Sequence, residues 1–264
     1  MTAVNEERAE KFFEEIEIPF LIHELKDPIA IIETGVRTLL EKQERFGSLT
    51  SKQENTLKRA LRNTKKARAM LSNILEIGRS ESGCFVCCRF QPEKSVFQAL
   101  KDALETSLTG PITDEIGKYE SKDEAASLLS GNGIFVATAS DVSRIEMFQD
   151  EIKFRQIAGN LFKNAIHHRS QRVDIRLEII HDCLSLSVSD DGPGIDPDQH
   201  ELVFRRYAQT KECSIVPRKG HGLGLAGARI LAKCLGGDIA LDSKTGEGAT
   251  FRLTIPLEMR QTQF

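Results

Sequence analysis

The chain has 264 residues, of which 40% are hydrophobic and 28% charged, and its formal net charge is −3 at pH 7. This composition is typical of a soluble globular protein with one large or two modest domains, and it excludes a disordered chain. The small negative charge gives no general attraction to nucleic acid or anionic membranes. No apolar run reaches the roughly 20 residues of a membrane-spanning helix, and the N-terminus lacks the pattern of a signal peptide. We therefore expect no nucleic-acid partner and a cytoplasmic location, although an anchor or sensor could lie outside this chain.

Two amphipathic helices are predicted in the first eighty residues. The first runs from about residue 6 to 46 and carries a heptad seam of apolar residues, namely Ile22, Leu25, Ile29, Ile32, Val36 and Leu39. The second covers roughly residues 51–78 and has a broad apolar stripe. The connection between them is short, so the two helices must run antiparallel. Because two helices cannot cover such stripes alone, we predict a homodimer in which two hairpins form a four-helix bundle.

The position of His23 on the first helix permits two interpretations. It lies one position past the seam residue Ile22, toward solvent, with Glu24 and Asp27 beside it. Pro28 removes a backbone hydrogen bond to the carbonyl of Glu24, so a kink or a looser turn is expected there. An exposed imidazole beside two carboxylates could act as a nucleophile. From this stretch alone, a solvated surface histidine at a kink is favoured.

A change of composition follows the helical part. Glycine, proline and three cysteines, Cys84, Cys87 and Cys88, interrupt the pattern. We place the boundary here, with a first domain over residues 1–83 and a second over residues 84–264. The cysteines are expected to be reduced in a cytosolic chain. Small buried side chains are favoured over half of a metal or redox site, because no second pair follows at matching spacing.

The second domain alternates helices and strands. A helix is predicted over residues 93–107, a mostly irregular segment over 109–133 and a buried strand over 134–139. Residues 173–180 and 183–189 alternate between apolar and polar side chains, which predicts the two strands of a hairpin.

A pair of asparagines lies on the helix that is predicted over residues 151–168. Asn160 and Asn164 are four residues apart and therefore project from one face. Two amide oxygens stacked in this way can ligate a hard cation such as Mg²⁺, which prefers oxygen ligands. Without the glycine-rich segments described next, a pair of solvent-facing amides would explain them equally well.

A carboxylate and a glycine turn end the second strand of the hairpin. Asp190 follows the strand directly, and Gly192 and Gly194 come after it. Such an ending holds a carboxylate at the sheet edge while glycine lets the backbone approach a ligand closely, although an ordinary turn uses the same residues. A buried carboxylate is costly unless it is paired, which favours a ligand as its partner. We expect Gly192 and Gly194 to keep side chains out of the pocket that would hold this ligand. Asp191 is expected to be solvated.

A glycine-rich segment opens the last predicted helix, which runs to about residue 235. Its residues are Gly220, Gly222, Leu223 and Gly224. Backbone N–H groups at a helix N-terminus bind phosphate through free donors and the positive end of the helix dipole. A dinucleotide fingerprint is excluded, because the strand–turn–helix context and the acidic residue about 20 positions further on are missing.

Four blocks in this order resemble the ATP site of the GHKL ATPase superfamily: the asparagine pair, the Asp190 turn, the glycine-rich helix start and the block Gly246-Glu247-Gly248-Ala249-Thr250. The stretch His23-Glu24-Leu25-Lys26-Asp27-Pro28-Ile29 resembles the phospho-acceptor motif of bacterial sensor histidine kinases, which place a helical hairpin before a GHKL domain. The resemblance covers nearly the whole chain. It implies an α+β protein in which an antiparallel helical hairpin is followed by an α/β sandwich with a mixed sheet.

The resemblance also implies cofactors and site residues. ATP and Mg²⁺ are expected, with Asn164 binding Mg²⁺ and Asn160 assisting. Asp190 is expected to accept a hydrogen bond from the adenine amine, and the Thr250 hydroxyl to reach the adenine. The other implied contacts are His167 near the phosphates where the family often has lysine, His168 stacked on the base, Arg206 at the start of a basic lid, and the phosphate loop of Gly220, Gly222, Leu223 and Gly224.

The implied reaction moves the γ-phosphoryl group of Mg-ATP to a nitrogen of His23 and then to an aspartate of a response-regulator receiver domain. The resemblance implies that Glu24 accepts a hydrogen bond from the other ring N–H of His23. Helix geometry alone favours Asp27 for this role, because it lies four residues from His23. The family usually has asparagine or threonine at Asp27, and an ionised carboxylate cannot donate a hydrogen bond. We therefore predict altered or weak phosphatase activity. The alternatives are a GHKL ATPase without phosphotransfer and, because of His167 and Asp27, a degenerate dimeric scaffold.

Overall fold

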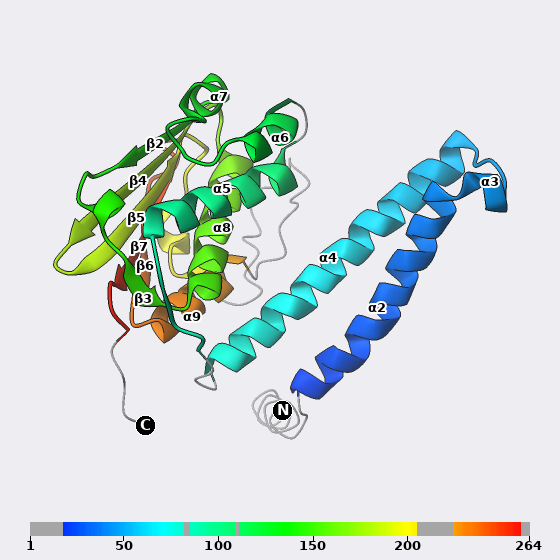
Figure 1. Cartoon of the computed structure of the whole chain (residues 1–264), viewed down its shortest axis with the longest axis horizontal. Helices are drawn as coiled ribbons and strands as arrows, with labels where there is room; N and C mark the ends of the chain where they lie inside the picture. Colours follow the sequence, from blue (N-terminus) through cyan, green and yellow to red (C-terminus); the bar gives the residue numbers. More distant parts are fainter. Residues whose placement is uncertain (1–17, 82–84, 109–110, 205–223, 260–264) are drawn as a thin grey trace. The chain divides into compact units, whose positions relative to one another are not determined.

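The computed structural model describes residues 18–81, 85–108, 111–204 and 224–259 (Figure 1). The chain divides into two compact units, residues 1–82 and residues 83–264, which are described separately. The first unit is helical, and the second combines helices with a sheet. Within the described ranges, no helix combines the length and apolar character that a membrane crossing requires.

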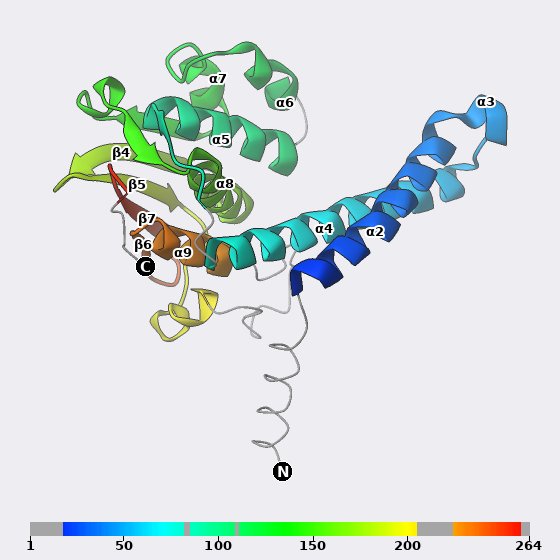
Figure 2. The same cartoon turned by 60° about the horizontal axis from the view of Figure 1, so that its bottom comes forward.

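The first unit is an antiparallel helical hairpin (Figure 2). Its helices are α2 (Ile18–Glu41), the short α3 (Gln43–Phe46) and α4 (Ser51–Glu81). After α3 the chain turns at Gly47, whose φ of +90° is readily adopted only by glycine. A reciprocal cap starts α4, because the Thr50 N–H donates to Gln53 Oε1 at 2.9 Å and the Gln53 N–H donates to Thr50 Oγ1 at 3.3 Å. These signals produce the predicted antiparallel connection.

The predicted apolar seam of α2 divides between two faces. Ile29 and Val36 are half-buried within the hairpin. Leu25, Ile32 and Leu39 recur every seven residues and are 50%, 54% and 37% exposed. One hairpin therefore leaves half of the predicted seam exposed, because 3.6 residues per turn rotate alternate seam positions away from α4.

A carboxylate occupies the buried side of α2 instead of an apolar residue. Glu33 is 2% exposed, and its two oxygens lie 2.5 Å from Arg37 Nη2 and 2.8 Å from Arg68 Nη1 of α4. The ion pair to Arg68 joins α2 to α4. The helix also continues through Pro28, so the predicted kink does not end it.

The second unit contains a five-stranded mixed sheet in the order β2-β4-β5-β7-β6. The strands are β2 (Ile134–Thr138), β4 (Val173–Ile180), β5 (Cys183–Asp190), β6 (Asp238–Ser243) and β7 (Ala249–Pro256). Only β2 and β4 are parallel among these neighbouring pairs. The predicted hairpin of β4 and β5 turns at His181 and Asp182, which have φ values of 49° and 59°. Positive φ at both turn residues suits a tight two-residue connection.

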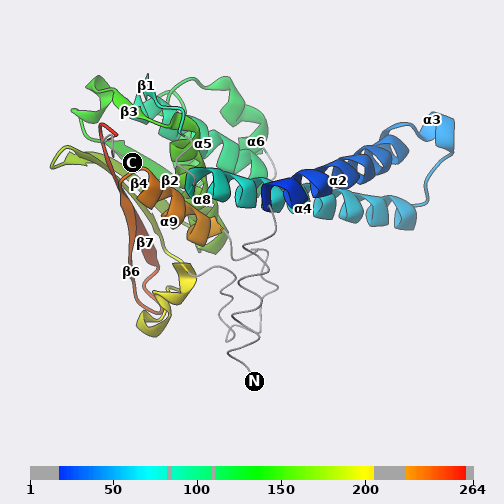
Figure 3. The same ribbon diagram turned by 90° about the horizontal axis from the view of Figure 1, so that it is seen from below.

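Three helices cover one face of this sheet, as Figures 1 and 3 show. They are α5 (Pro92–Ser107), α8 (Glu151–His168) and α9 (Gly224–Cys234). The alternation of β5 and β7 places Leu186, Val188 and Phe251 in the core beneath the helices. Arg252 and Thr254 on the other face of β7 are exposed. The sheet is therefore buried on one side and solvated on the other.

Several short elements lie outside the predicted pattern. Strands β1 (Cys88–Phe90) and β3 (Met147–Gln149) form a separate antiparallel pair. The segment predicted to be mostly irregular contains α6 (Pro111–Glu115), the 3-10 turn η1 (Ile116–Lys118) and α7 (Ala126–Gly131). Further 3-10 turns are η2 (Val142–Arg144), η3 (Pro197–Gln199) and η4 (Leu202–Phe204).

The cysteine cluster differs from the expectation of buried side chains. Cys88 is exposed on β1, and Cys87 is half-buried with its Sγ atom 3.1 Å from Met259 Sδ. Burial, followed by the charge of Asp150, raises the pKa of the Cys87 thiol. Cys84 lies outside the described residues. This environment disfavours the reactive thiolate at Cys87.

Candidate functional site

Asp190 is the buried carboxylate at the end of β5. Its side chain lies on the helix-covered face and the residue is 8% exposed. The Gly192 N–H donates to Oδ1 at 3.0 Å, and the Ala249 N–H also donates to the carboxylate. Oδ2 is buried and has no hydrogen-bond partner among the described residues. Burial raises the pKa of Asp190, and the unpartnered oxygen is an acceptor for a ligand donor.

The glycines around Asp190 bring backbone segments into contact with one another. A Cβ atom on Gly192 would lie 2.3 Å from the carbonyl oxygen of His168, and one on Gly194 would lie 1.9 Å from that of Lys244. A Cβ on Gly248 would lie 2.0 Å from the carbonyl oxygen of Asp190. The expectation that Gly192 and Gly194 keep side chains out of a ligand pocket stays a prediction. Their missing side chains permit close backbone packing within the protein.

The predicted asparagine pair lies on α8 next to the start of α9. Asn160 and Asn164 are half-buried at the edge of the buried face of α8. Asn160 Oδ1 would lie 3.7 Å from a Cβ on Gly224, the first residue of α9. The Asn160 amide oxygen therefore lies beside the first described residue of α9. No cluster of three or more His, Cys, Asp or Glu side chains suited to a metal ion occurs in the part of the chain that the structure describes.

The last turn of α8 carries the two predicted histidines. Both are exposed, and their rings meet edge to face with centroids 4.9 Å apart. The His168 carbonyl also lies against Gly192, as described above. The structure therefore brings this end of α8 next to the Asp190 turn.

Thr250 does not lie beside the Asp190 carboxylate, and its predicted role is corrected. Ala249 is the β7 residue opposite Asp190, while Thr250 is opposite Ser189. Neighbouring residues of a strand point to opposite faces of the sheet. The Thr250 hydroxyl accordingly lies 2.8 Å from the Ser189 hydroxyl, on the face away from the helices. The prediction was wrong by one residue, which reverses the side chain's direction.

The other predicted site residues are described only in part. Arg206, Gly220, Gly222 and Leu223, together with the basic lid, lie outside the described residues. The backbone of His23 belongs to α2. Glu24 and Asp27 have exposed side chains on the same helix. The phospho-acceptor motif is thus helical, as predicted.

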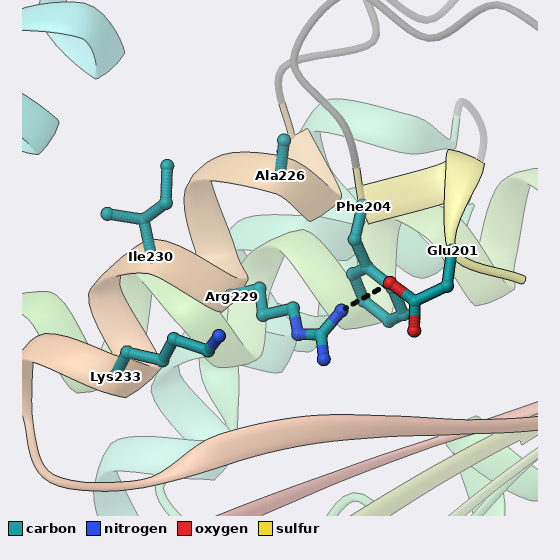
Figure 4. A pocket seen from close by; sticks show the side chains of 6 residues that line it. All are labelled: Glu201, Phe204, Ala226, Arg229, Ile230 and Lys233. Atoms are coloured by element: carbon teal, nitrogen blue, oxygen red, sulfur yellow. Dashed lines mark ion pairs between the residues drawn. The ribbon is translucent and has the colours of Figure 1, made fainter.

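Sequence reasoning missed a cluster around Arg229 of α9. Its guanidinium lies 4.6 Å from the Phe204 ring centroid, 3.1 Å from Asp238 Oδ1 and 3.6 Å from Glu201 Oε2. Figure 4 shows Glu201, Phe204 and Arg229 lining a surface hollow of about 190 Å³ with Ala226, Ile230 and Lys233. Burial alone would raise the pKa of Asp238, but the hydrogen bond from Arg229 lowers it overall. Charged residues spread over distant segments gave no sequence signal for this cluster.

Comparisons with known protein families agree with this architecture. Residues 20–83 match the family described as the His Kinase A (phospho-acceptor) domain. Residues 149–259 match the family described as histidine kinase-, DNA gyrase B- and HSP90-like ATPase. The fold and this match define the second unit as a domain of this ATPase class. With both domains in this order, the chain belongs to the two-component sensor histidine kinases.

Individual relatives support this assignment. Adaptive-response sensory kinase SasA of Synechococcus sp. (strain JA-2-3B'a(2-13)) is 26% identical over 249 residues, which are 93% of this chain and 60% of SasA. Aerobic respiration control sensor protein ArcB of Escherichia coli (strain K12) is 40% identical over 113 residues, which are 42% of this chain and 14% of ArcB. The chain therefore spans less than two thirds of the length of either relative.

A solved structure has the same fold. Full-length ShkA in complex with AMPPNP is 22% identical, with a TM-score of 0.65 over 91% of this chain and 45% of that chain. This likeness concerns the fold of the chain, including its helical region and its mixed-sheet domain.

Proposed function

We propose that this protein transfers the γ-phosphoryl group of Mg-ATP to a nitrogen of His23 and then to an aspartate on a response-regulator receiver domain. One observation carries the nucleotide part of the proposal, namely the buried Asp190 carboxylate with an unpartnered oxygen at the end of β5. The exocyclic amine of adenine supplies the N–H donor that this oxygen lacks. A water molecule would also satisfy it. A nucleotide is favoured because the turn lies against the end of α8, the helix that carries Asn160 next to the start of α9.

The triphosphate would lie toward the start of α9. Free N–H groups there and the positive end of the helix dipole favour negative charge. Asn164 and Asn160 would hold Mg²⁺ through their amide oxygens, and the bound ion would neutralise phosphate charge. In this scheme His167 lies near the phosphates and His168 near the base, which agrees with their places at the end of α8 next to Gly192.

His23 would attack as a neutral imidazole, which is the main form of an unperturbed histidine at pH 7. In-line transfer breaks the bond between the γ-phosphorus and the bridging oxygen, forms the bond from phosphorus to nitrogen and releases Mg-ADP. Glu24 would accept the hydrogen bond of the second ring N–H, with Asp27 as the second candidate. Both carboxylates are exposed on α2 and therefore open to a docked ATPase domain.

The proposed active form is a homodimer. Leu25, Ile32 and Leu39 form an exposed apolar stripe on α2 with a spacing of seven residues. A stripe at this spacing suits the seam between helices of a bundle. A second copy of the chain would cover this stripe. The receiver domain is a different partner, which would accept the phosphoryl group.

The test is to incubate the full chain with radiolabelled ATP and Mg²⁺. We expect acid-labile, base-stable label on the wild type and none on His23→Gln, because phosphohistidine is lost in acid and survives in base. ATP hydrolysis without such label would instead support a GHKL ATPase without phosphotransfer. Absence of both nucleotide binding and label would support a degenerate dimeric scaffold and end the kinase proposal.

A further inference from the structure

The carboxylate of Asp191 is exposed, as the sequence predicted, and it is also held by the loop that follows α8. Oδ1 accepts hydrogen bonds from three consecutive backbone N–H groups, those of Ser170, Gln171 and Arg172, at 2.9, 3.0 and 2.9 Å. Oδ2 also accepts from the Gln171 N–H at 3.1 Å. Because the residue is exposed, burial does not force the carboxylate into this position. Its geometry is that of a carboxylate in a nest of backbone donors.

The receiving loop is fixed independently of Asp191. Arg172 makes two hydrogen bonds to Asp174, at 2.6 and 2.7 Å, and its guanidinium lies 4.3 Å from the centroid of the Phe135 ring. On the other side, the missing Cβ of Gly133 allows the Gln171 carbonyl oxygen to approach within 2.0 Å of the Cβ position. Loss of the Asp191 carboxylate would therefore release the Asp190 turn and leave the loop in place.

The Asp190 turn is attached at both of its ends. Downstream, the Ile195 N–H donates to Ser243 Oγ at 2.9 Å, and Ser243 Oγ donates to the Gly248 carbonyl at 2.6 Å. Upstream, the Asp191 N–H donates to the Arg172 carbonyl at 3.3 Å, and the carboxylate adds the shorter contacts described above. The main side-chain attachment at the upstream end, next to Asp190 itself, is thus Asp191.

We propose that Asp191 is a positioning residue for nucleotide recognition, which fixes the Asp190 carboxylate and the backbone at Gly192 against the end of α8. This inference rests on the proposed function, in which Asp190 receives the adenine amine. The attachment acts at the end of the site that would hold the base. Its loss therefore weakens the binding of adenosine, ADP and ATP by the same factor. A contact to the phosphates would instead affect ATP and ADP more than adenosine.

The experiment compares the full-length wild type with Asp191→Ala and Asp191→Asn. Affinities for ATP, ADP and adenosine are measured by competition with a fluorescent adenine nucleotide. We expect Asp191→Ala to raise each Kd about tenfold, the effect of losing charge-assisted hydrogen bonds that position the site. Asp191→Asn keeps one acceptor oxygen but places an amide donor near the Gln171 N–H, so its Kd values fall between those of wild type and Asp191→Ala.

Two further measurements separate positioning from a general loss of folding. At saturating ATP, the rate of His23 phosphorylation by Asp191→Asn is expected to equal that of the wild type, so that KM rises and kcat does not. Asp198→Ala, which removes an exposed carboxylate from the following 3-10 turn, is the matched control and should leave all affinities unchanged.

The outcomes distinguish the inference from the proposed function. Equal affinities of wild type, Asp191→Asn and Asp191→Ala would overturn the role of Asp191 while leaving ATP binding in place. A loss of affinity for ATP and ADP without a loss of affinity for adenosine would also overturn the role of Asp191. A wild type without affinity for any of the three ligands would overturn the proposed function and this inference together.

Discussion

Glu33 in the helical hairpin and Asp190 in the ATPase unit are both buried, at 2% and 8% exposure, but their oxygens are partnered differently. Each oxygen of Glu33 has an arginine nitrogen within 2.8 Å as an ion-pair partner, although Oε2 accepts no hydrogen bond. Asp190 Oδ2 has neither an ion-pair partner nor a hydrogen-bond donor among the described residues. A carboxylate that is paired within its own unit joins two helices. A carboxylate left with a free buried acceptor raises the energy of the empty protein, and a ligand can recover that energy.

The largest expected effect is that of Asp190→Asn. Replacing the acceptor oxygen by an amide should weaken ATP binding about 100-fold, because a hydrogen bond to a charged acceptor is lost and two donors face each other. The raised pKa of Asp190 means that its ionised form disfavours folding as the pH rises through that pKa. The neutral variant should therefore melt about 2–4 °C higher at pH 7, if about 1 kcal/mol is recovered.

Calorimetric titration with ATP and a thermal melt without ligand check both halves of this prediction. Asp242→Asn, at an exposed site on β6, serves as the control. A variant that bound ATP like the wild type, or that melted several degrees lower, would show that Asp190 has the same structural role as Glu33.

The second prediction concerns Glu33→Gln in the hairpin. The charge partner of two arginines is removed, and we expect a loss of about 1–2 kcal/mol in unfolding free energy, less than for a fully buried pair. Arg37 and Arg68 are 47% and 51% exposed and can turn toward water. Denaturant unfolding of the full chain, followed at a probe in the hairpin, measures the loss.

Glu33→Leu is the companion variant for the same position. An apolar side chain of similar size should recover most of the stability, because replacing a buried ion pair by packed hydrophobic atoms is often neutral. ATP affinity should match the wild type in both Glu33 variants. A reduced ATP affinity would contradict the separation between the structural and the ligand-binding carboxylate.

The third prediction uses Asp27, a carboxylate of the hairpin that is exposed. If this protein dephosphorylates its regulator, Asp27→Asn should raise the rate about fivefold, because the amide supplies a hydrogen-bond donor that an ionised carboxylate lacks. The rate of phosphate release from a phosphorylated receiver domain is the measurement. Equal and robust rates for wild type and variant would remove the argument from donor chemistry.

The smallest expected effect is that of Arg229→Ala on stability at different pH. Removing the stacking on Phe204 and the exposed ion pairs should cost about 1 kcal/mol near pH 7. The lowered pKa of Asp238 means that its stabilising contribution is present above its unfolded pKa and is lost as the pH falls through the folded pKa. The difference in unfolding free energy between variant and wild type should therefore be smaller at about pH 3 than near pH 7. Urea unfolding at both pH values measures it. A difference that grew toward acid would contradict the assigned ion pair.

Much of the fold could be predicted because its signals are local. Period-two alternation identified β4 and β5, and the short connection at Gly47 required antiparallel helices. Asp190 was placed correctly at a strand end and as a buried group. Strands β1 and β3 were missed because three-residue segments carry too little periodicity, and they pair across a long stretch of chain.

The errors at the site have a common cause in register and tertiary contact. Thr250 is one residue from the position opposite Asp190, and a shift of one residue on a strand reverses the face. The partners of Asp191 and Arg229 come from other segments, so no local pattern contains them. Glu33 lies beside the predicted apolar seam, and only the positions of Arg37 and Arg68 explain how a charge is buried there.

The close backbone contacts at Gly192, Gly194 and Gly248 have a consequence for inhibition. Main-chain atoms at these glycines lie against carbonyl groups near Asp190 and would form part of the wall of the proposed adenine site. A substitution at any of the three glycines would have to displace a loop, because the added carbon atom would collide with a carbonyl group. A competitive inhibitor that touches this wall would therefore meet fewer routes to resistance than one that relies on the side chains of α8.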